Sequence, residues 1–132
     1  MAIEYRDTHN FTADALGDLF LSVGWVAGNY PDKLVIALGN SSTVYSAWDA
    51  DRLVGLVNAL DDGVMTAYVH FLLVHPEYQQ QGVGKELMRR IMERYQDILR
   101  MVLISDDQEA DFYQKMGLRA SEGTTALLGG TI

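Results

Sequence analysis

The chain has 132 residues, 48% of them hydrophobic, which is the size and composition of one folded domain with a substantial core. It has no cysteine, which excludes disulfides, thiolate metal sites and a cysteine nucleophile, and which is compatible with a reducing cytoplasm. The formal net charge of −8 disfavours nucleic acid and anionic membranes as partners. Because the sequence also shows neither a membrane-spanning apolar run nor a basic-then-apolar leader, we expect a cytoplasmic protein.

The N-terminal part predicts a strand followed by two helices. Residues 2–6 alternate apolar and polar side chains, which is typical of a short strand. Apolar residues at helical spacing predict the helices at residues 13–23 and 32–38. A glycine-bounded loop, residues 24–31, lies between them and carries the large aromatic side chains Trp25 and Tyr30.

The middle of the chain predicts an antiparallel meander. Its strands are expected at residues 42–48, 52–60 and 64–75. Short turns rich in Asp and Gly join them, so neighbouring strands run in opposite directions. The last strand is nearly all apolar in its second half, and we therefore expect it to be buried on both faces at the centre of the sheet.

The C-terminal part predicts a helical crossover. A helix over residues 84–99 precedes a buried strand at 101–104, which must lie parallel to the strand before the helix. A further helix is expected at residues 109–116, with Gly117 ending it. Short closing strands are predicted at residues 118–120 and 124–128.

The junction between the last meander strand and its helix is the most informative stretch. The apolar strand stops at His75 and Pro76, and the helix that follows opens at Gly82 and Gly84. A helix N-terminus presents free backbone N–H groups and a partial positive charge, which suit a phosphate group. Glycine lets this backbone approach a ligand without a Cβ in the way.

Two phosphate-loop motifs fail at this junction and a third is met. A P-loop requires Ser or Thr after its lysine, but Glu86 follows Lys85. A dinucleotide fingerprint requires a third small residue where Leu87 stands. The pattern Gln-x-x-Gly-x-Gly runs from Gln79 to Gly84, with a plain strand-to-helix turn as the alternative interpretation.

Two motifs together resemble the GNAT acetyltransferase superfamily. One runs from Leu72-x-Val74-His75-Pro76 to Gln79-x-x-Gly82-x-Gly84, and the other is Phe112-Tyr113-Gln114-Lys115-Met116-Gly117-Leu118. They stand in the family's order and on the expected elements, and the likeness covers nearly the whole chain. A finer similarity, to bacterial members described as aralkylamine N-acetyltransferase-like, is carried by residues 46–49, 52–55 and Tyr78-Gln79.

The resemblance implies an α/β (α+β) GNAT fold formed by a single domain over residues 1–132. This fold has a mixed, mostly antiparallel sheet with one central, splayed parallel strand pair, flanked by helices. The resemblance also implies acetyl-CoA as co-substrate, with no metal. Leu72, Leu73 and Val74 would offer backbone groups to pantetheine, and an N–H there would polarise the thioester carbonyl. The pyrophosphate would be held by the segment Gln79, Gln80, Gln81, Gly82, Val83, Gly84 and Lys85.

The resemblance further implies catalytic roles on two elements. Tyr113 is expected to protonate the departing CoA thiolate as general acid. Family members often carry a base Glu where this chain has Tyr68. His70 lies two residues further along the same strand face, so it is a candidate for the base, for the acceptor-pocket wall or for a structural role. Two further departures, Phe71 and Asp106, stand where related members often have a carboxylate and an Asn.

The expected reaction is direct acetyl transfer from acetyl-CoA to the primary amine of a small molecule. Trp25, Tyr30 and Tyr68 are expected to contact that acceptor, since the loop between the first helices covers the acceptor site in this family. The alternatives are a non-catalytic acyl-CoA sensor, motivated by the missing Glu, and an acetyltransferase for protein lysines or N-termini. A homodimer is compatible with a member of this size.

Overall fold

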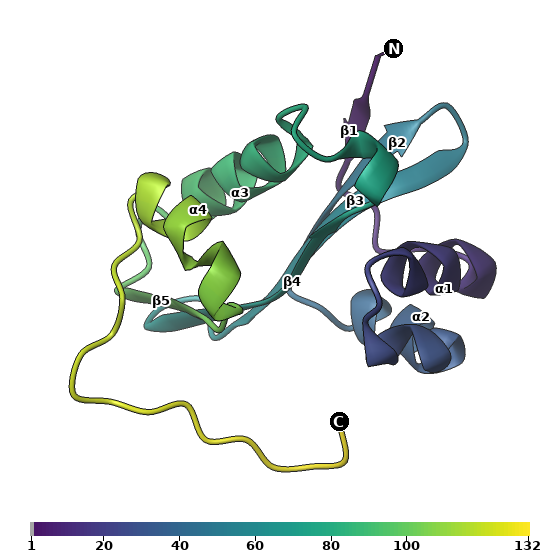
Figure 1. Ribbon diagram of the computed structural model, residues 1–132. Helices are drawn as coiled ribbons and strands as arrows, with labels where there is room; N and C mark the ends of the chain where they lie inside the picture. The colour runs from purple at the N-terminus through teal and green to yellow at the C-terminus, as the bar shows by residue number, and fades with distance from the viewer. Residues whose placement is uncertain (1) are drawn as a thin grey trace.

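The computed structural model describes residues 2–132 and forms one mixed sheet within them, with strand order β1-β2-β3-β4-β5 (Figure 1). The strands are β1 (Glu4–Arg6), β2 (Thr43–Asp49), β3 (Arg52–Asp61), β4 (Thr66–Val74) and β5 (Arg100–Leu103). The α-helices are α1 (Ala13–Ser22), α2 (Pro31–Gly39), α3 (Val83–Arg94) and α4 (Ala110–Lys115). Short 3-10 turns are η1 (Val26–Asn29), η2 (Pro76–Tyr78) and η3 (Asp107–Glu109).

Local signals in the sequence set the helix starts. Thr12 caps α1 by accepting the Ala15 N–H at 3.1 Å. Pro31 occupies the first position of α2, where its missing N–H leaves no helical bond unmade. Gly82 precedes α3 in the left-handed region, with φ of 85°, and so turns the chain directly into the helix.

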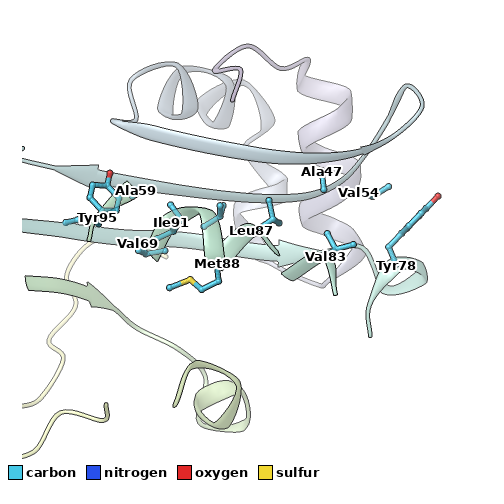
Figure 2. Close-up of a cluster of buried hydrophobic side chains, with 12 residues drawn as sticks. Ala47, Val54, Ala59, Val69, Tyr78, Val83, Leu87, Met88, Ile91 and Tyr95 are labelled. Carbon is cyan, nitrogen blue, oxygen red and sulfur yellow. The ribbon is translucent and has the colours of Figure 1, made fainter. Parts of the chain in front are cut away.

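The helices cover the two faces of the sheet (Figure 1). Helices α1 and α2 pack on one face around Leu16, Phe20 and Leu38, each fully buried. Helix α3 packs on the other face through the core drawn in Figure 2. Leu87 and Ile91 of α3 are fully buried there, so the amphipathic helix fixes its own rotation by burying one apolar stripe.

The meander is antiparallel, as predicted, and its β3–β4 turn is organised by one side chain. The Asp62 carboxylate accepts backbone N–H groups from Val64, Met65 and Thr66 at 2.7–3.1 Å. These bonds lower the pKa of Asp62. Gly63 supplies the left-handed conformation that the turn needs.

Strands β4 and β5 are parallel for only part of their length. The paired residues run from Thr66 with Arg100 to Val69 with Leu103. Beyond this point β4 continues to Val74, still paired with β3, while β5 has ended. The expected splayed parallel pair is therefore present, and the residues of β4 after Val69 form one wall of a gap.

Three details of the prediction were wrong. Strand β4 is not buried on both faces, because its second half borders the gap and leaves His70 exposed. Helix α3 ends at Arg94 and not near residue 99. Residues 118–132, all within the described part of the chain, form no strand; they are mostly exposed and carry no strand pairing to hold them on the sheet. Among the helices of residues 2–132, none is long and apolar enough to cross a membrane.

Candidate active site

A cleft of about 1210 Å³ occupies the gap between β4 and β5. One wall is the second half of β4, and the other is formed by residues 104–106 together with α4. The loop from Val23 to Ala27 and the N-terminal end of α3 complete the lining. The cleft therefore brings together the three segments that the sequence motifs singled out.

The α3 end of the cleft presents backbone amides. The first bond of this helix joins the Glu86 N–H to the Gly82 carbonyl at 3.0 Å. The amides of Val83, Gly84 and Lys85 precede that bond, so they have no helical acceptor and point out of the helix end. This is an anion-binding arrangement, which suits a phosphate or diphosphate group.

The loop before α3 is held in an unusual conformation. Gln80 has φ of 62°, a left-handed value that is costly for a residue with a Cβ. The Gln79 side chain donates to the Val74 carbonyl at 2.9 Å, which ties the loop to the end of β4. These two glutamines line the cleft, together with Gly82, Gly84 and Lys85.

Two residues of the predicted loop point elsewhere. The Gln81 side chain donates to the Glu77 carbonyl at 3.3 Å and does not line the cleft. The Val83 side chain is 2% exposed and belongs to the core under α3. Only their backbone groups are available to a ligand at this end.

The β4 wall presents backbone groups of two alternate residues. The Phe71 and His75 N–H groups are directed at β3, where they bond to Asn58 Oδ1 and to the Val54 carbonyl. Backbone direction alternates along a strand, so the N–H groups of Leu72 and Val74 face the cleft. Leu73, also predicted to contact pantetheine, is paired with β3 through its backbone.

Tyr113, the predicted general acid, lines the cleft from α4. Burial, followed by the nearby carboxylates of Glu109 and Asp106, raises its pKa to about 12. The phenol is therefore protonated at neutral pH and can donate a proton to an anion formed beside it.

His70 lines the cleft on a stack of aromatic rings. Its ring lies 3.8 Å from that of Phe71 and 5.4 Å from that of Tyr68, measured between centroids. His70 is open to the cleft on one side, and partial desolvation lowers its pKa, so the imidazole is neutral near pH 7 and can accept a proton. Phe71 also contacts Trp25, whose ring is 6.1 Å away.

Two of the predicted acceptor contacts do not reach the cleft. Tyr68 lies where β4 is still paired with β5, opposite Val102. Tyr30 is exposed, and its ring faces the Lys33 ammonium at 5.6 Å. Trp25 alone of the three residues lines the cleft.

Sequence reasoning did not place Glu109 and Phe112 in the cleft, although both line it. The signal that could have found them is helical spacing. Glu109 stands four residues before Tyr113, so one turn of helix brings them to the same side of α4. Among residues 2–132, no group of three His, Asp or Glu side chains converges as metal ligands.

Comparisons with known proteins identify the family. The family model described as "Acetyltransferase (GNAT) domain" matches residues 31–127 of this chain. An uncharacterized N-acetyltransferase, ycf52, of Gracilaria tenuistipitata var. liui is 36% identical over 73% of this chain and 56% of its own length. The chain thus spans little more than half of that relative.

Solved structures agree with this match. A GNAT family acetyltransferase from Streptococcus pneumoniae TIGR4 superposes with a TM-score of 0.84, at 26% identity and over 98% of both chains. The fold is also that of AAC(6')-Iy, solved with a bisubstrate analog of CoA, with a TM-score of 0.74, 12% identity, and coverage of 99% of this chain and all of that one. The chain belongs to the GNAT family of acetyltransferases.

Proposed function

We propose that this protein transfers the acetyl group of acetyl-CoA to the primary amine of a small molecule. The observation that carries the proposal is the parting of β4 from β5 directly beside the free amides of α3. A diphosphate at the helix end and a thin thioester arm along β4 would together fill this arrangement.

Acetyl-CoA supplies an activated acetyl group as its thioester. The Leu72 and Val74 N–H groups face the cleft, where one of them can donate to the thioester carbonyl as negative charge develops on oxygen. The chain contributes this donor from a strand that β3 holds rigid, so little reorganisation is needed.

Proton transfers are assigned to two side chains. The acceptor ammonium must lose a proton before its nitrogen can attack, and neutral His70 at the cleft wall can take it, directly or through water. The C–N bond then forms as the C–S bond breaks, and Tyr113 protonates the departing thiolate. The second proton of the attacking nitrogen then passes to the Tyr113 phenolate, directly or through water, while the first leaves His70 for solvent. The products are an acetamide and CoA with a free thiol.

The acceptor end of the cleft is apolar on one side and acidic on the other. Trp25 and Phe71 provide rings, while Asp106 and Glu109 provide carboxylates. Rings and carboxylates both attract an organic ammonium ion, which supports an amine with an apolar body.

The test is release of free CoA thiol from acetyl-CoA in the presence of a panel of amines. The panel contains alkyl, arylalkyl and polyamine acceptors, amino acids and a lysine peptide, with an amine-free control. Amine-dependent thiol release, with the acetylated product seen by mass spectrometry, is expected for at least one small amine. Release with the peptide alone would move the assignment to protein acceptors.

A non-catalytic acyl-CoA sensor is the second candidate. It is favoured by the absence of a carboxylate at Tyr68 and by the position of this residue outside the cleft. This candidate predicts saturable binding of acetyl-CoA by calorimetry without transfer to any amine. Binding and transfer measured on the same sample distinguish the two functions.

A further inference from the structure

A buried polar side chain lies under the β4 wall of the cleft. Asn58 of β3 is 2% exposed, between Val57 and Ala59, which are fully buried. An amide in such a place is costly unless its oxygen and nitrogen are both bonded. Both are bonded here, and one of the bonds reaches the active-site strand.

Asn58 faces a bulge in β4. Ala59 pairs with Val69 and Val57 pairs with Leu72, so β4 has an extra residue opposite Asn58. The Phe71 N–H, which lies in this bulge, donates to Asn58 Oδ1 at 2.9 Å. A side chain thus takes the role that a main-chain carbonyl has elsewhere in the ladder.

The other end of the amide is anchored at α2. Asn58 Nδ2 donates to Ser41 Oγ at 3.0 Å, and the Ser41 hydroxyl donates to the Ala37 carbonyl at 2.9 Å. Because the Ser41 hydroxyl proton is donated to the Ala37 carbonyl, the Ser41 oxygen can only accept a hydrogen bond from Asn58. This polarity fixes the orientation of the amide and directs Oδ1 at the Phe71 N–H.

The bulge coincides with the point at which the sheet opens. Val69 is the last β4 residue paired with β5, and the bulge follows it immediately. Neighbouring side chains on a regular strand point to opposite faces, yet the His70 and Phe71 rings stack at 3.8 Å. The bulge has therefore turned both rings toward the same region, at the cleft wall.

We propose that Asn58 is a positioning residue for acyl transfer, an inference that rests on the proposed function. By holding the Phe71 N–H, it fixes the bulge and so the place where β4 leaves β5. The bulge in turn determines the direction in which the Leu72 and Val74 N–H groups point. It also determines the orientation of the His70 and Phe71 rings. Asn58 itself is buried behind the strand and touches no substrate.

The experiment compares two substitutions that keep the branched shape and the number of side-chain heavy atoms of Asn. Asn58→Leu leaves the Phe71 N–H without an acceptor, whereas Asn58→Asp retains a carboxylate oxygen for it, to which Ser41 can also rotate its hydroxyl. In Asn58→Leu we expect kcat/KM for the amine to fall roughly 10- to 100-fold, because a misplaced wall disturbs the attack geometry. In Asn58→Asp we expect kcat/KM to stay closer to wild type.

The affinity for adenosine 3′,5′-bisphosphate, which lacks pantetheine, provides an internal comparison. The phosphate end of the site is built by α3 and not by the bulge, so the Kd for this nucleotide should change by less than about twofold in Asn58→Leu. Thr43→Val is the matched control. It removes a buried hydrogen bond of the same sheet, between Thr43 and the Tyr95 hydroxyl at 2.7 Å, and should leave kcat/KM within about twofold of wild type.

A readout independent of turnover separates this inference from the proposed function. Hydrogen exchange of the Phe71 amide, followed by NMR, should accelerate roughly tenfold or more in Asn58→Leu but not in Asn58→Asp or Thr43→Val. If the wild type transfers no acetyl group while exchange follows this pattern, Asn58 still holds the β4 bulge through the Phe71 N–H, and it is the proposed reaction that is wrong. Asn58→Ser, whose shorter side chain cannot reach Phe71, gives the same comparison if Asn58→Leu does not fold.

Two outcomes overturn the proposal. One is a folded Asn58→Leu protein with wild-type kcat/KM or wild-type Phe71 exchange. The other is an Asn58→Asp protein with wild-type stability that is as impaired in kcat/KM as Asn58→Leu, which would show that the acceptor for the Phe71 N–H is not what matters at this position.

Discussion

At the scale of single residues, the cleft depends on groups held in unusual states. Tyr113 is kept protonated by burial and by carboxylates, and partial desolvation at the cleft wall lowers the pKa of His70 and so favours its neutral form. Gln80 sits in a left-handed conformation that glycine would adopt without cost. Strain and shifted pKa values of this kind concentrate at sites of chemistry.

Replacing Tyr113 with Phe removes the proton donor while keeping the ring. We expect kcat to fall by about 100-fold, because the thiolate must then leave without general-acid help. The Kd for CoA, measured by calorimetry, should stay near wild type. An unchanged kcat in Tyr113→Phe would show that the thiolate is protonated by another group.

The pH dependence of transfer should carry the signature of His70. Its pKa is lowered below 6.5, so the neutral form accumulates as pH rises through a value under 6.5. We expect kcat/KM to rise with pH over that window in the wild type and to lose this limb in His70→Gln. The acceptor should be an amine whose own pKa lies outside the window. The same shift lowers stability as the pH falls, because the unfolded chain binds the proton more readily.

Replacing Gln80 with Gly should stabilise the fold. The native φ of 62° costs a side chain about 1 kcal/mol, which glycine does not incur, although its greater freedom when unfolded offsets part of the gain. Thermal unfolding should show a higher Tm, with Gln81→Gly, which has no such φ, as the control. A Tm equally lowered in both variants would contradict the assignment of strain to Gln80.

At the scale of elements, the seating of α3 on β3 decides where the diphosphate amides lie. Gly55 of β3 lies under the start of this helix, and a Cβ there would meet Val83 Cγ1 at 3.1 Å and Leu87 Cδ1 at 3.2 Å. These contacts are tighter than ordinary packing, so the absence of a side chain at Gly55 allows the close approach.

Gly55→Ala should therefore push the start of α3 away from the sheet. We expect a loss of about 1–3 kcal/mol in the free energy of unfolding and a weaker affinity for CoA. Gly39→Ala at the end of α2, where an added Cβ meets nothing within 4 Å, is the matched control and should lower neither the stability nor the affinity for CoA. Full CoA affinity in Gly55→Ala would show that the helix end tolerates displacement.

At the scale of the whole molecule, the strands and helices that build the cleft could be predicted from the sequence. Alternating or continuous apolar patterns located β1–β5, helical spacing located α1–α4, and the glycine pair located the start of α3. The acceptor contacts were not predictable, because only the tertiary structure shows that Tyr30 and Tyr68 do not line the cleft. The bulge was also hidden, since Asn58 reads as an ordinary strand residue until its partner across the sheet is known.

The most direct measurement is an NMR titration of backbone amides with CoA and, separately, with adenosine 3′,5′-bisphosphate. CoA should shift the amides from Gly82 to Lys85 together with those of Leu72 and Val74, whereas the nucleotide, which lacks pantetheine, should leave the β4 amides unmoved. Shifts confined to other surfaces, or none at saturating CoA, would contradict an acyl-donor site between the parted strands.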